Sequence, residues 1–270
     1  MSVILHVPHA STVIPADVRA DIVLDDAALA RELLASTDHH TDTLIAGLES
    51  AFAVSDHDGG RARRVRAYVN GLSRLVVDPE RFLDPEREAT ETVGRGAVYT
   101  RCADGTVLRD VDAAGWPAMR ADLIARHFAP YHAGIEQLVA GMVAVHGSCT
   151  VIDVHSYPQE AQRYELDGGL DPAARRPQLC VGTDPVHTPA ALVVGVERVA
   201  QALRFEVARD TPFSGTFVPS AWLGDTRVAA VMLEVRRDTY MDEGTGLLHE
   251  GAAQVSELIR RVVAQMVAGE

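Results

Sequence analysis

The amino-acid sequence predicts an α/β fold in which a largely buried sheet lies between helices. Its short apolar runs are typical of buried strands, and they alternate with segments of helical periodicity. The chain has 270 residues, of which 47% are hydrophobic and 23% are charged, as in ordinary globular proteins. Because it contains no obvious linker, internal repeat or low-complexity tract, we expect a single domain spanning 1–270.

The first part of the chain predicts several short strands and one long helix. An apolar run at 3–7 predicts a strand that opens into a loop at Pro8. Apolar spacing predicts a helix over 26–50 that contains the motif TDHHTD. The next expected elements are strands at 51–54, 65–69 and 73–78, with a charged, glycine-containing turn at 55–64 between the first two.

The rest of the chain alternates strands and helices after one polar segment. Residues 84–115 predict an inserted long loop with a small hairpin at 97–110, and loops of this length are commonly functional or mobile. Apolar runs predict strands at 150–154, 178–182 and 228–235. Helices are expected at 116–146, where Pro130 would divide the segment in two, and at 188–204 and 245–268.

Charge and composition exclude several classes of function. Lysine and arginine total 25 and aspartate and glutamate total 38, which gives a formal net charge of −13. This balance argues against nucleic acid as a partner but leaves small anionic substrates open. The sequence has no apolar stretch of ~18 residues that would span a membrane. Three distant cysteines and no visible signal peptide favour a reducing, cytoplasmic location.

Polar residues with catalytic potential follow three of the predicted strands. His9 follows the first strand, His155 ends a middle strand, and Glu234 lies near the end of a late strand. In open α/β sheets, ligands bind beyond the carboxyl ends of strands. Asp153 would face the same side as His155, where its carboxylate could orient that imidazole.

A metal site is one interpretation of the histidines and acidic residues. A catalytic zinc ion commonly has three protein ligands from His, Asp and Glu, and His9, Asp38 and His155 would supply such a set if the fold brings them together. The TDHHTD motif also fits a solvated helix face, and for His9 alone a histidine that caps a loop is the commoner outcome. Spacing alone leaves these alternatives open.

Two arginines flank an aspartate in the segment SRLVVDPER. Arg74 and Arg81 have the planar fork that suits a substrate carboxylate, although pairing with Asp78 or Glu80 is an equally good structural role. Ser156 follows His155, but no GxSxG motif is present, so we do not expect a serine hydrolase.

The sequence resembles the N-formylglutamate amidohydrolase family in eight blocks that occur in the family's order between residues 3 and 243. The blocks are VILHVPHASTVIP, STDHHTDTL, SRLVVDPER, APYHAGIEQLV (with Tyr131 and His132), VIDVHSYP, LCVGT, PFSGTFV and MLEVRRDTYMDE. The resemblance implies a mixed sheet between helices, related to the zinc carboxypeptidases. It also implies hydrolysis of an N-acylated acidic amino acid, typically releasing formate and glutamate in histidine breakdown.

The resemblance also implies roles for particular residues. One Zn²⁺ per chain would be held by His9, Asp38 and His155, with His6 or Asp42 as replacements for Asp38, and Glu234 would be the general base. An arginine, Tyr240 or His132 would stabilise the oxyanion, while Arg74, Arg81 and Arg237 are candidates for holding the substrate carboxylate.

Two departures from the family pattern bear on the substrate. The family's Asn-Arg pair is Glu80-Arg81 here, and Arg236 replaces another asparagine. Because Glu80 adds negative charge, a different N-acyl amino acid or small amide also fits. A peptidase or deacylase with a wider cleft is a further possibility. The alternative from another class is a non-catalytic protein that binds an acidic metabolite, with 84–115 as a gating or partner-binding loop.

Overall fold

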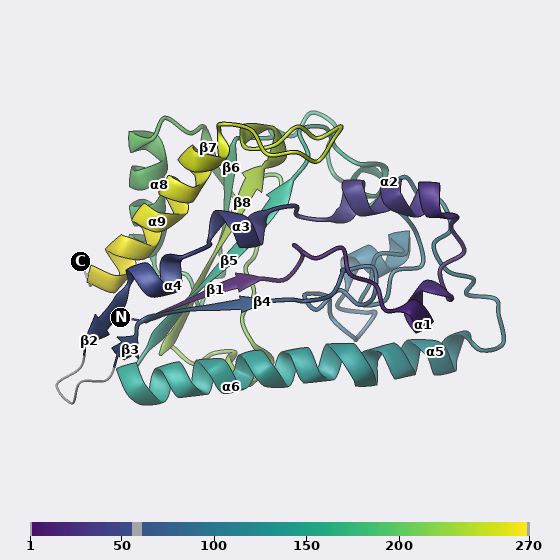
Figure 1. Cartoon of the computed structure of the whole chain (residues 1–270), viewed down its shortest axis with the longest axis horizontal. Helices are drawn as coiled ribbons and strands as arrows, with labels where there is room; N and C mark the ends of the chain where they lie inside the picture. Colours follow the sequence, from purple (N-terminus) through teal and green to yellow (C-terminus); the bar gives the residue numbers. More distant parts are fainter. Residues whose placement is uncertain (1, 56–60, 269–270) are drawn as a thin grey trace.

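The computed structural model describes residues 2–55 and 61–268 and folds them around a mixed sheet (Figure 1). Within these residues the sheet has six strands in the order β4-β1-β5-β8-β6-β7. The strands are β1 (Ser2–Val7), β4 (Val65–Val69), β5 (Cys149–Tyr157), β6 (Leu179–Gly182), β7 (Val207–Arg209) and β8 (Val228–Arg236). Neighbouring strands are parallel except β6 and β8, which are antiparallel. The predicted mixed α/β class is therefore confirmed.

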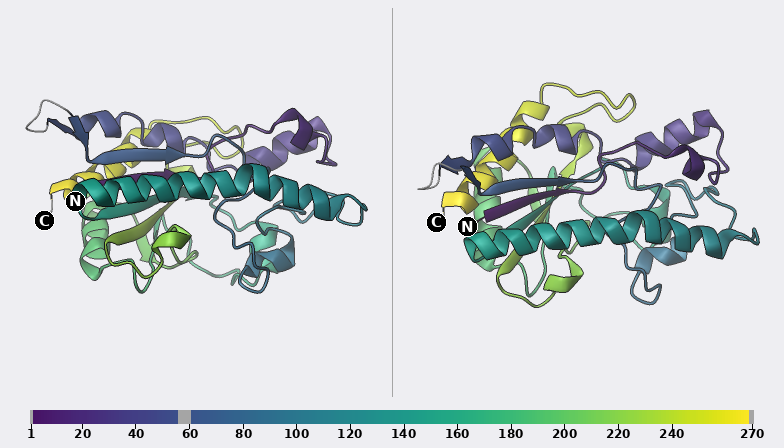
Figure 2. Two further views of the ribbon diagram at one scale, coloured as in Figure 1. Left: turned by 90° about the horizontal axis from the view of Figure 1, so that it is seen from below. Right: turned by 60° about the horizontal axis from the view of Figure 1, so that its bottom comes forward.

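Helices cover both faces of the sheet (Figure 2). The main helices are α2 (Asp26–Ser36), α5 (Trp116–Leu123), α6 (Ala129–His146), α8 (Ala190–Ala202) and α9 (Ala252–Ala268). Short ones are α1 (Ala16–Arg19), α3 (Thr41–Leu44), α4 (Leu48–Ala51), α7 (Arg163–Asp167) and the 3₁₀ turns Ala89–Val93, Ser220–Trp222 and Arg237–Thr239. None of the helices in the described part of the chain has the length and apolar character needed to cross a membrane.

Alternation along the strands divides the core between the two faces. In β1, Ile4 packs in a cluster with Ile135 and Val139 of α6, whereas Val3 and Leu5 pack in a cluster that includes residues of α8 and α9. Every residue of β1 and β5 is buried, and the strands are mainly apolar apart from polar residues such as His6, Asp153 and His155 toward their carboxyl ends. This rigid sheet fixes where each strand ends and therefore where its polar residues lie.

The predicted helix over 26–50 is wrong as a single element. Helix α2 ends at Ser36, and His40 has a φ of 66°, a left-handed conformation that interrupts helical geometry. Thr41 then donates through its side chain to the Asp38 carbonyl at 2.9 Å as α3 begins. Apolar spacing continues across this break, so periodicity alone did not reveal it. The break places Asp38 on a turn instead of a helix face.

The predicted strand at 73–78 is also wrong. The amide of Val76 donates to the Ser73 carbonyl at 2.9 Å, which forms a turn, and Leu75 and Val76 are buried in two separate apolar clusters outside the sheet. The apolar run is explained by burial without strand pairing.

Pro130 does not divide the helical segment at 116–146. A π-type turn at Ile124–Phe128 joins α5 to α6, and the two form one long rod (Figure 1). Since proline lacks an amide hydrogen, the irregular hydrogen bonding of the π turn accommodates it.

Other predicted boundaries shift by a few residues. The strand expected at 51–54 is β2 (Ala53–Ser55), which pairs with β3 (Arg61–Arg63). Part of the predicted turn between them, 56–60, lies outside the described residues. The last helix begins at Ala252 and not at residue 245. In 84–115 an antiparallel bridge joins Arg101 to Val107, within the expected hairpin.

Candidate metal and active site

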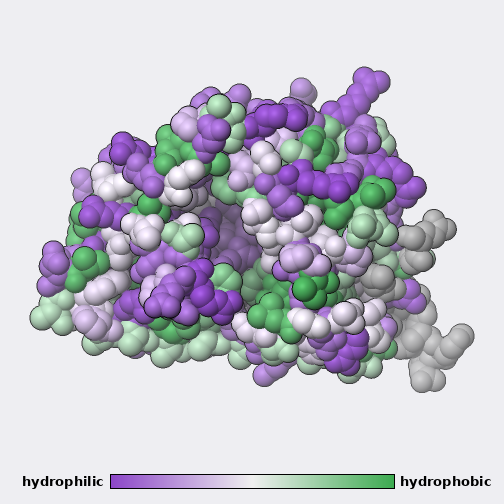
Figure 3. Space-filling view, turned by 180° about the vertical axis from the view of Figure 1, so that it is seen from behind, coloured by the Kyte–Doolittle hydropathy of each residue, from purple (hydrophilic) through white to green (hydrophobic). Residues whose placement is uncertain are grey.

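A cavity of about 420 Å³ lies at the carboxyl ends of β5 and β8. Near the centre of one face, the space-filling view shows a hollow with largely hydrophilic walls (Figure 3). Because β5 and β8 are parallel and in register, His155 is the direct neighbour of Glu234 across the two strands. The residues lining the cavity include His9, Asp38, Arg74, Glu80, Arg81, Asp153, His155, Glu234 and Arg237. Topology therefore brings most of the predicted site residues together.

His9, Asp38 and His155 lie in direct contact although the chain separates them widely. Nδ1 of His155 is 3.1 Å from Asp38 Oδ2 and 3.3 Å from His9 Nδ1, and the His9 Nδ1–Asp38 Oδ2 distance is 3.6 Å. Tetrahedral zinc with bonds of ~2.0–2.1 Å requires ligand atoms about 3.3 Å apart. The donor set and its spacing therefore fit a zinc ion.

Backbone and side-chain contacts hold this triad in place. The Asp38 amide donates to the His9 carbonyl at 3.0 Å, which ties the turn after α2 to the loop after β1. Arg237 donates to Asp38 Oδ1 at 3.1 Å and leaves Oδ2 facing the two imidazoles. These contacts therefore fix the orientation of the Asp38 carboxylate.

Two further carboxylates contact the imidazoles through their Nε2 atoms, on the side of each ring opposite Nδ1. Asp78 Oδ1 lies 2.9 Å from His9 Nε2, and Asp153 Oδ1 lies 2.9 Å from His155 Nε2. Carboxylates in this position fix the tautomer and raise the basicity of a metal-binding histidine. The sequence predicted this role for Asp153. For Asp78 it predicted only ion pairing with an arginine.

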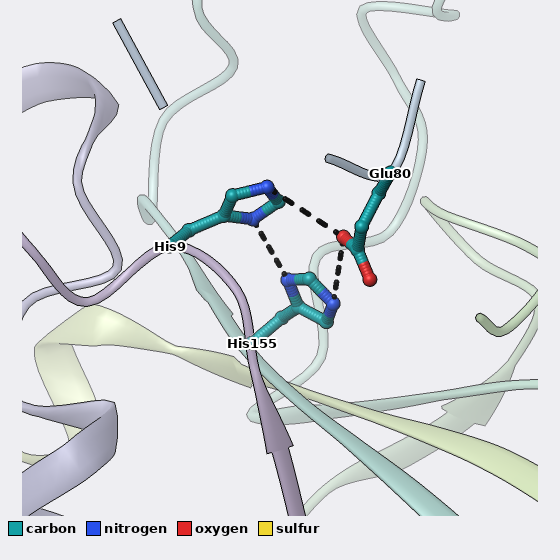
Figure 4. Close-up of side chains that lie close together, drawn as sticks. All are labelled: His9, Glu80 and His155. Atoms are coloured by element: carbon teal, nitrogen blue, oxygen red, sulfur yellow. Dashed lines mark hydrogen bonds and ion pairs between the residues drawn. The ribbon is translucent and has the colours of Figure 1, made fainter. Parts of the chain in front are cut away.

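Glu80 forms a second grouping with the same histidines (Figure 4). Its Oε2 atom lies 3.1 Å from His155 Nε2 and 3.7 Å from His9 Nε2, so the three could also hold an ion. We favour the set with Asp38 because all three of its ligand-atom distances, 3.1, 3.3 and 3.6 Å, lie near the spacing that zinc requires. Sequence reasoning missed this proximity because it considered Glu80 only as a partner of the arginines or as a charge beside the substrate.

The alternative ligands His6 and Asp42 lie in different surroundings. The ring nitrogens of His6 contact Asp153 Oδ1 at 2.8 Å and the Tyr131 hydroxyl at 2.7 Å. Asp42 is exposed, accepts from the Thr43 amide and does not line the cavity. Neither takes the place of Asp38 beside His9.

Electrostatics favour ionised ligands in the triad. Burial alone would raise the pKa of Asp38, but hydrogen bonds from His155 and His9 and the charge of Arg74 hold that pKa well below its usual range. Burial lowers the pKa of His155, yet Asp153 and Glu80 raise it well above its ordinary value. Without a cation, Asp38 is therefore ionised and His155 is protonated, and a metal ion that binds His155 would displace a proton.

Glu234 has the properties of a general base. The residue is 8% exposed and lines the cavity, and burial raises its pKa to about 7. A carboxylate with a pKa near the working pH exchanges protons efficiently.

The arginines of the cavity differ in how many donors remain free. Arg74 donates to Asp78 at 2.7 Å, and Arg237 donates to Asp38, the Ala35 carbonyl and Ser156. Among the described residues, Arg81 makes only longer ion pairs, 3.5 Å to Asp78 and 3.9 Å to Glu88, and its buried Nε has no hydrogen-bond partner there. At 24% side-chain exposure, Arg81 is the best placed of the three to receive a carboxylate.

His132 and Tyr240, expected near the oxyanion, lie outside the cavity lining. His132 Nε2 is bonded to the Pro79 carbonyl at 2.8 Å, and the Tyr240 hydroxyl donates to the His39 carbonyl at 2.8 Å. Both contacts hold loops that carry site residues, Glu80 in one case and Asp38 in the other. These bonds favour positioning roles.

Comparisons with known proteins identify a family and a fold for this chain. A family model described as N-formylglutamate amidohydrolase matches residues 1–241. The chain is similar to the crystal structure of N-formylglutamate amidohydrolase from Ralstonia eutropha JMP134, with a TM-score of 0.75 and 23% identity over 98% of this chain and 92% of that one. A gene product from Agrobacterium tumefaciens gives a TM-score of 0.64 and 17% identity over 99% and 90%. No curated protein matches the sequence significantly.

Proposed function

Because the chain belongs to the N-formylglutamate amidohydrolase family, we propose that it hydrolyses the amide bond of a small N-acyl amino acid such as N-formylglutamate in a metal-dependent reaction. The observation that carries the proposal is the convergence of His9, Asp38 and His155 beside Glu234 in one cavity. We further propose that the enzyme acts in the cytoplasm on a small acidic substrate, in keeping with its sparse cysteines.

The three converging side chains would hold one zinc ion. When bound, zinc polarises an amide carbonyl and makes water a stronger acid. The remaining roles belong to residues of this chain. Asp78 and Asp153 keep the Nδ1 atoms of the two imidazoles turned toward Asp38.

Glu234 would act in both proton transfers. Its carboxylate accepts a proton from the attacking water and then delivers that proton to the leaving nitrogen. The protonated carboxyl is accessible near neutral pH because burial disfavours its charge. Arg81 would bind the substrate carboxylate with donors that no hydrogen bond in the described structure uses.

A hydrolysis screen tests this function. The zinc-loaded protein is incubated with N-formyl, N-acetyl and N-succinyl derivatives of several amino acids, and the release of free amine is measured. We expect turnover of an N-formyl or related acyl amino acid that falls by about 10²–10⁴-fold when Glu234 is changed to Gln. Tight binding of these compounds without turnover would instead support the non-catalytic alternative.

A further inference from the structure

We propose that His6, Glu80 and Asp153 form a second divalent-cation site, separate from the triad of His9, Asp38 and His155. The site lies deeper along β1 and β5, on the other side of the His155 ring. The inference deepens the proposed function and rests on it for the first metal ion.

Three parts of the chain bring donor atoms to this point. His6 Nδ1 lies 2.8 Å from Asp153 Oδ1 and 3.5 Å from Glu80 Oε1, and one ligand atom of each residue lies within 4.8 Å of the others. An imidazole with two carboxylates suits zinc and similar first-row divalent ions. His6 and Asp153 are buried, so their orientations are fixed by packing.

A buried atom without a hydrogen-bond partner points into the same space. Among the described residues, Glu80 Oε1 has no such partner. His155 is only 5% exposed, and its Nε2 lies 2.9 Å from Asp153 Oδ1 and 3.1 Å from Glu80 Oε2. Buried polar atoms in this state are costly unless a proton, a water molecule or an ion satisfies them.

The charges around the two carboxylates favour an ion. Arg74 and Arg81 pair with Asp78, and Arg237 pairs with Asp38. In the described part of the chain, every ion pair of Asp153 and Glu80 is with a histidine.

Tyr131 supports a ligand role for His6. Its hydroxyl lies 2.7 Å from His6 Nε2, so when that oxygen accepts the Nε2 proton, the Nδ1 lone pair faces the two carboxylates. His6 Nδ1 and Glu80 Oε1 then offer lone pairs to the same point as Asp153 Oδ1, which also accepts the Nε2 proton of His155. A cation at this point would also offset the negative charge that Glu80 presents to an anionic substrate.

Metal stoichiometry tests the second site directly. The metal-free full-length chain is dialysed against ZnCl₂, and zinc per chain is measured for wild type, Glu80→Gln, His6→Asn and Asp38→Asn. We expect two ions in wild type and one in each variant. Glu86→Gln removes the same charge from an exposed position of the neighbouring loop and should keep both ions.

Titration with CoCl₂ separates the two sites by a spectroscopic signature. We expect visible absorption to change up to two equivalents in wild type and up to one in Glu80→Gln, whose fold is checked by circular dichroism. One ion in wild type that Asp38→Asn loses and Glu80→Gln keeps would overturn the second site and leave the proposed function intact. No bound ion in wild type would overturn both.

Discussion

Asp78 Oδ1 lies 2.9 Å from His9 Nε2, although 69 residues separate the two in sequence. An ionised carboxylate can only accept a hydrogen bond, so His9 carries its proton on Nε2 and presents Nδ1 to Asp38 and His155. Burial would raise the pKa of Asp78, but Arg74 and His9 hold it well below its usual range. Asp78 is therefore the residue that sets the tautomer of the first metal ligand.

Changing Asp78 to Asn tests this relationship. The amide keeps the size of the side chain but is a weaker acceptor, so we expect zinc affinity to fall by about 10–100-fold. Competition with a chromophoric chelator measures the affinity. Asp84→Asn is the matched control, because Asp84 is exposed on the following loop. Unchanged zinc affinity in Asp78→Asn would remove Asp78 from the site.

Changing Glu234 to Gln tests the general base. We expect kcat to fall by about 10²–10⁴-fold because the amide cannot accept the proton of the attacking water. Zinc content should stay at the wild-type value, since His9, Asp38 and His155 supply the ligands. Loss of zinc together with activity would make Glu234 a metal ligand.

The pH dependence of kcat/KM follows from the environment of Glu234. A general base must be ionised, and burial raises the pKa of Glu234 to about 7. We therefore expect kcat/KM to fall as pH decreases through that pKa. The acidic limb of the pH profile should have its midpoint at or below about pH 7, because a bound cation favours the ionised carboxylate. Steady-state rates across this range measure the limb. A limb that persists unchanged in the residual activity of Glu234→Gln would assign it to another group.

Changing Arg81 to Ala tests substrate binding. A hydrogen bond between charged groups contributes ~1.5–3 kcal/mol, so kcat/KM should fall by about 10–100-fold, mainly through KM. Arg87→Ala is the control, because Arg87 is exposed on the same loop and stacks on Phe82 at 4.3 Å. Equal effects of the two substitutions would indicate general electrostatic attraction instead of a specific contact.

The sequence predicted strands well where burial is continuous. The runs that form β1, β5, β6 and β8 are almost entirely buried, so each contains a stretch of consecutive apolar residues that the sequence reveals. The same signal failed at 73–78, where Leu75 and Val76 are buried by packing without pairing. It also failed at His40, where a left-handed residue interrupts an apolar pattern that continues beyond it.

The site was predictable in composition but not in its contacts. Strand ends identified His9, His155 and Glu234, because the carboxyl edge of a sheet collects ligands. The proximity of Glu80 to His155 depends on the turn in the segment 73–78, which the apolar pattern predicted to be a strand. Likewise, the bond between Tyr240 and the His39 carbonyl spans 201 residues and leaves no local pattern in the sequence.

Turnover after metal removal tests the central claim most directly. The protein is stripped with a chelator and assayed with N-formylglutamate and the best substrate of the screen, before and after zinc is restored. We expect no turnover in the stripped protein, recovery in wild type, and no recovery in His155→Ala. Full turnover by the stripped protein would contradict metal-dependent hydrolysis at His9, Asp38 and His155.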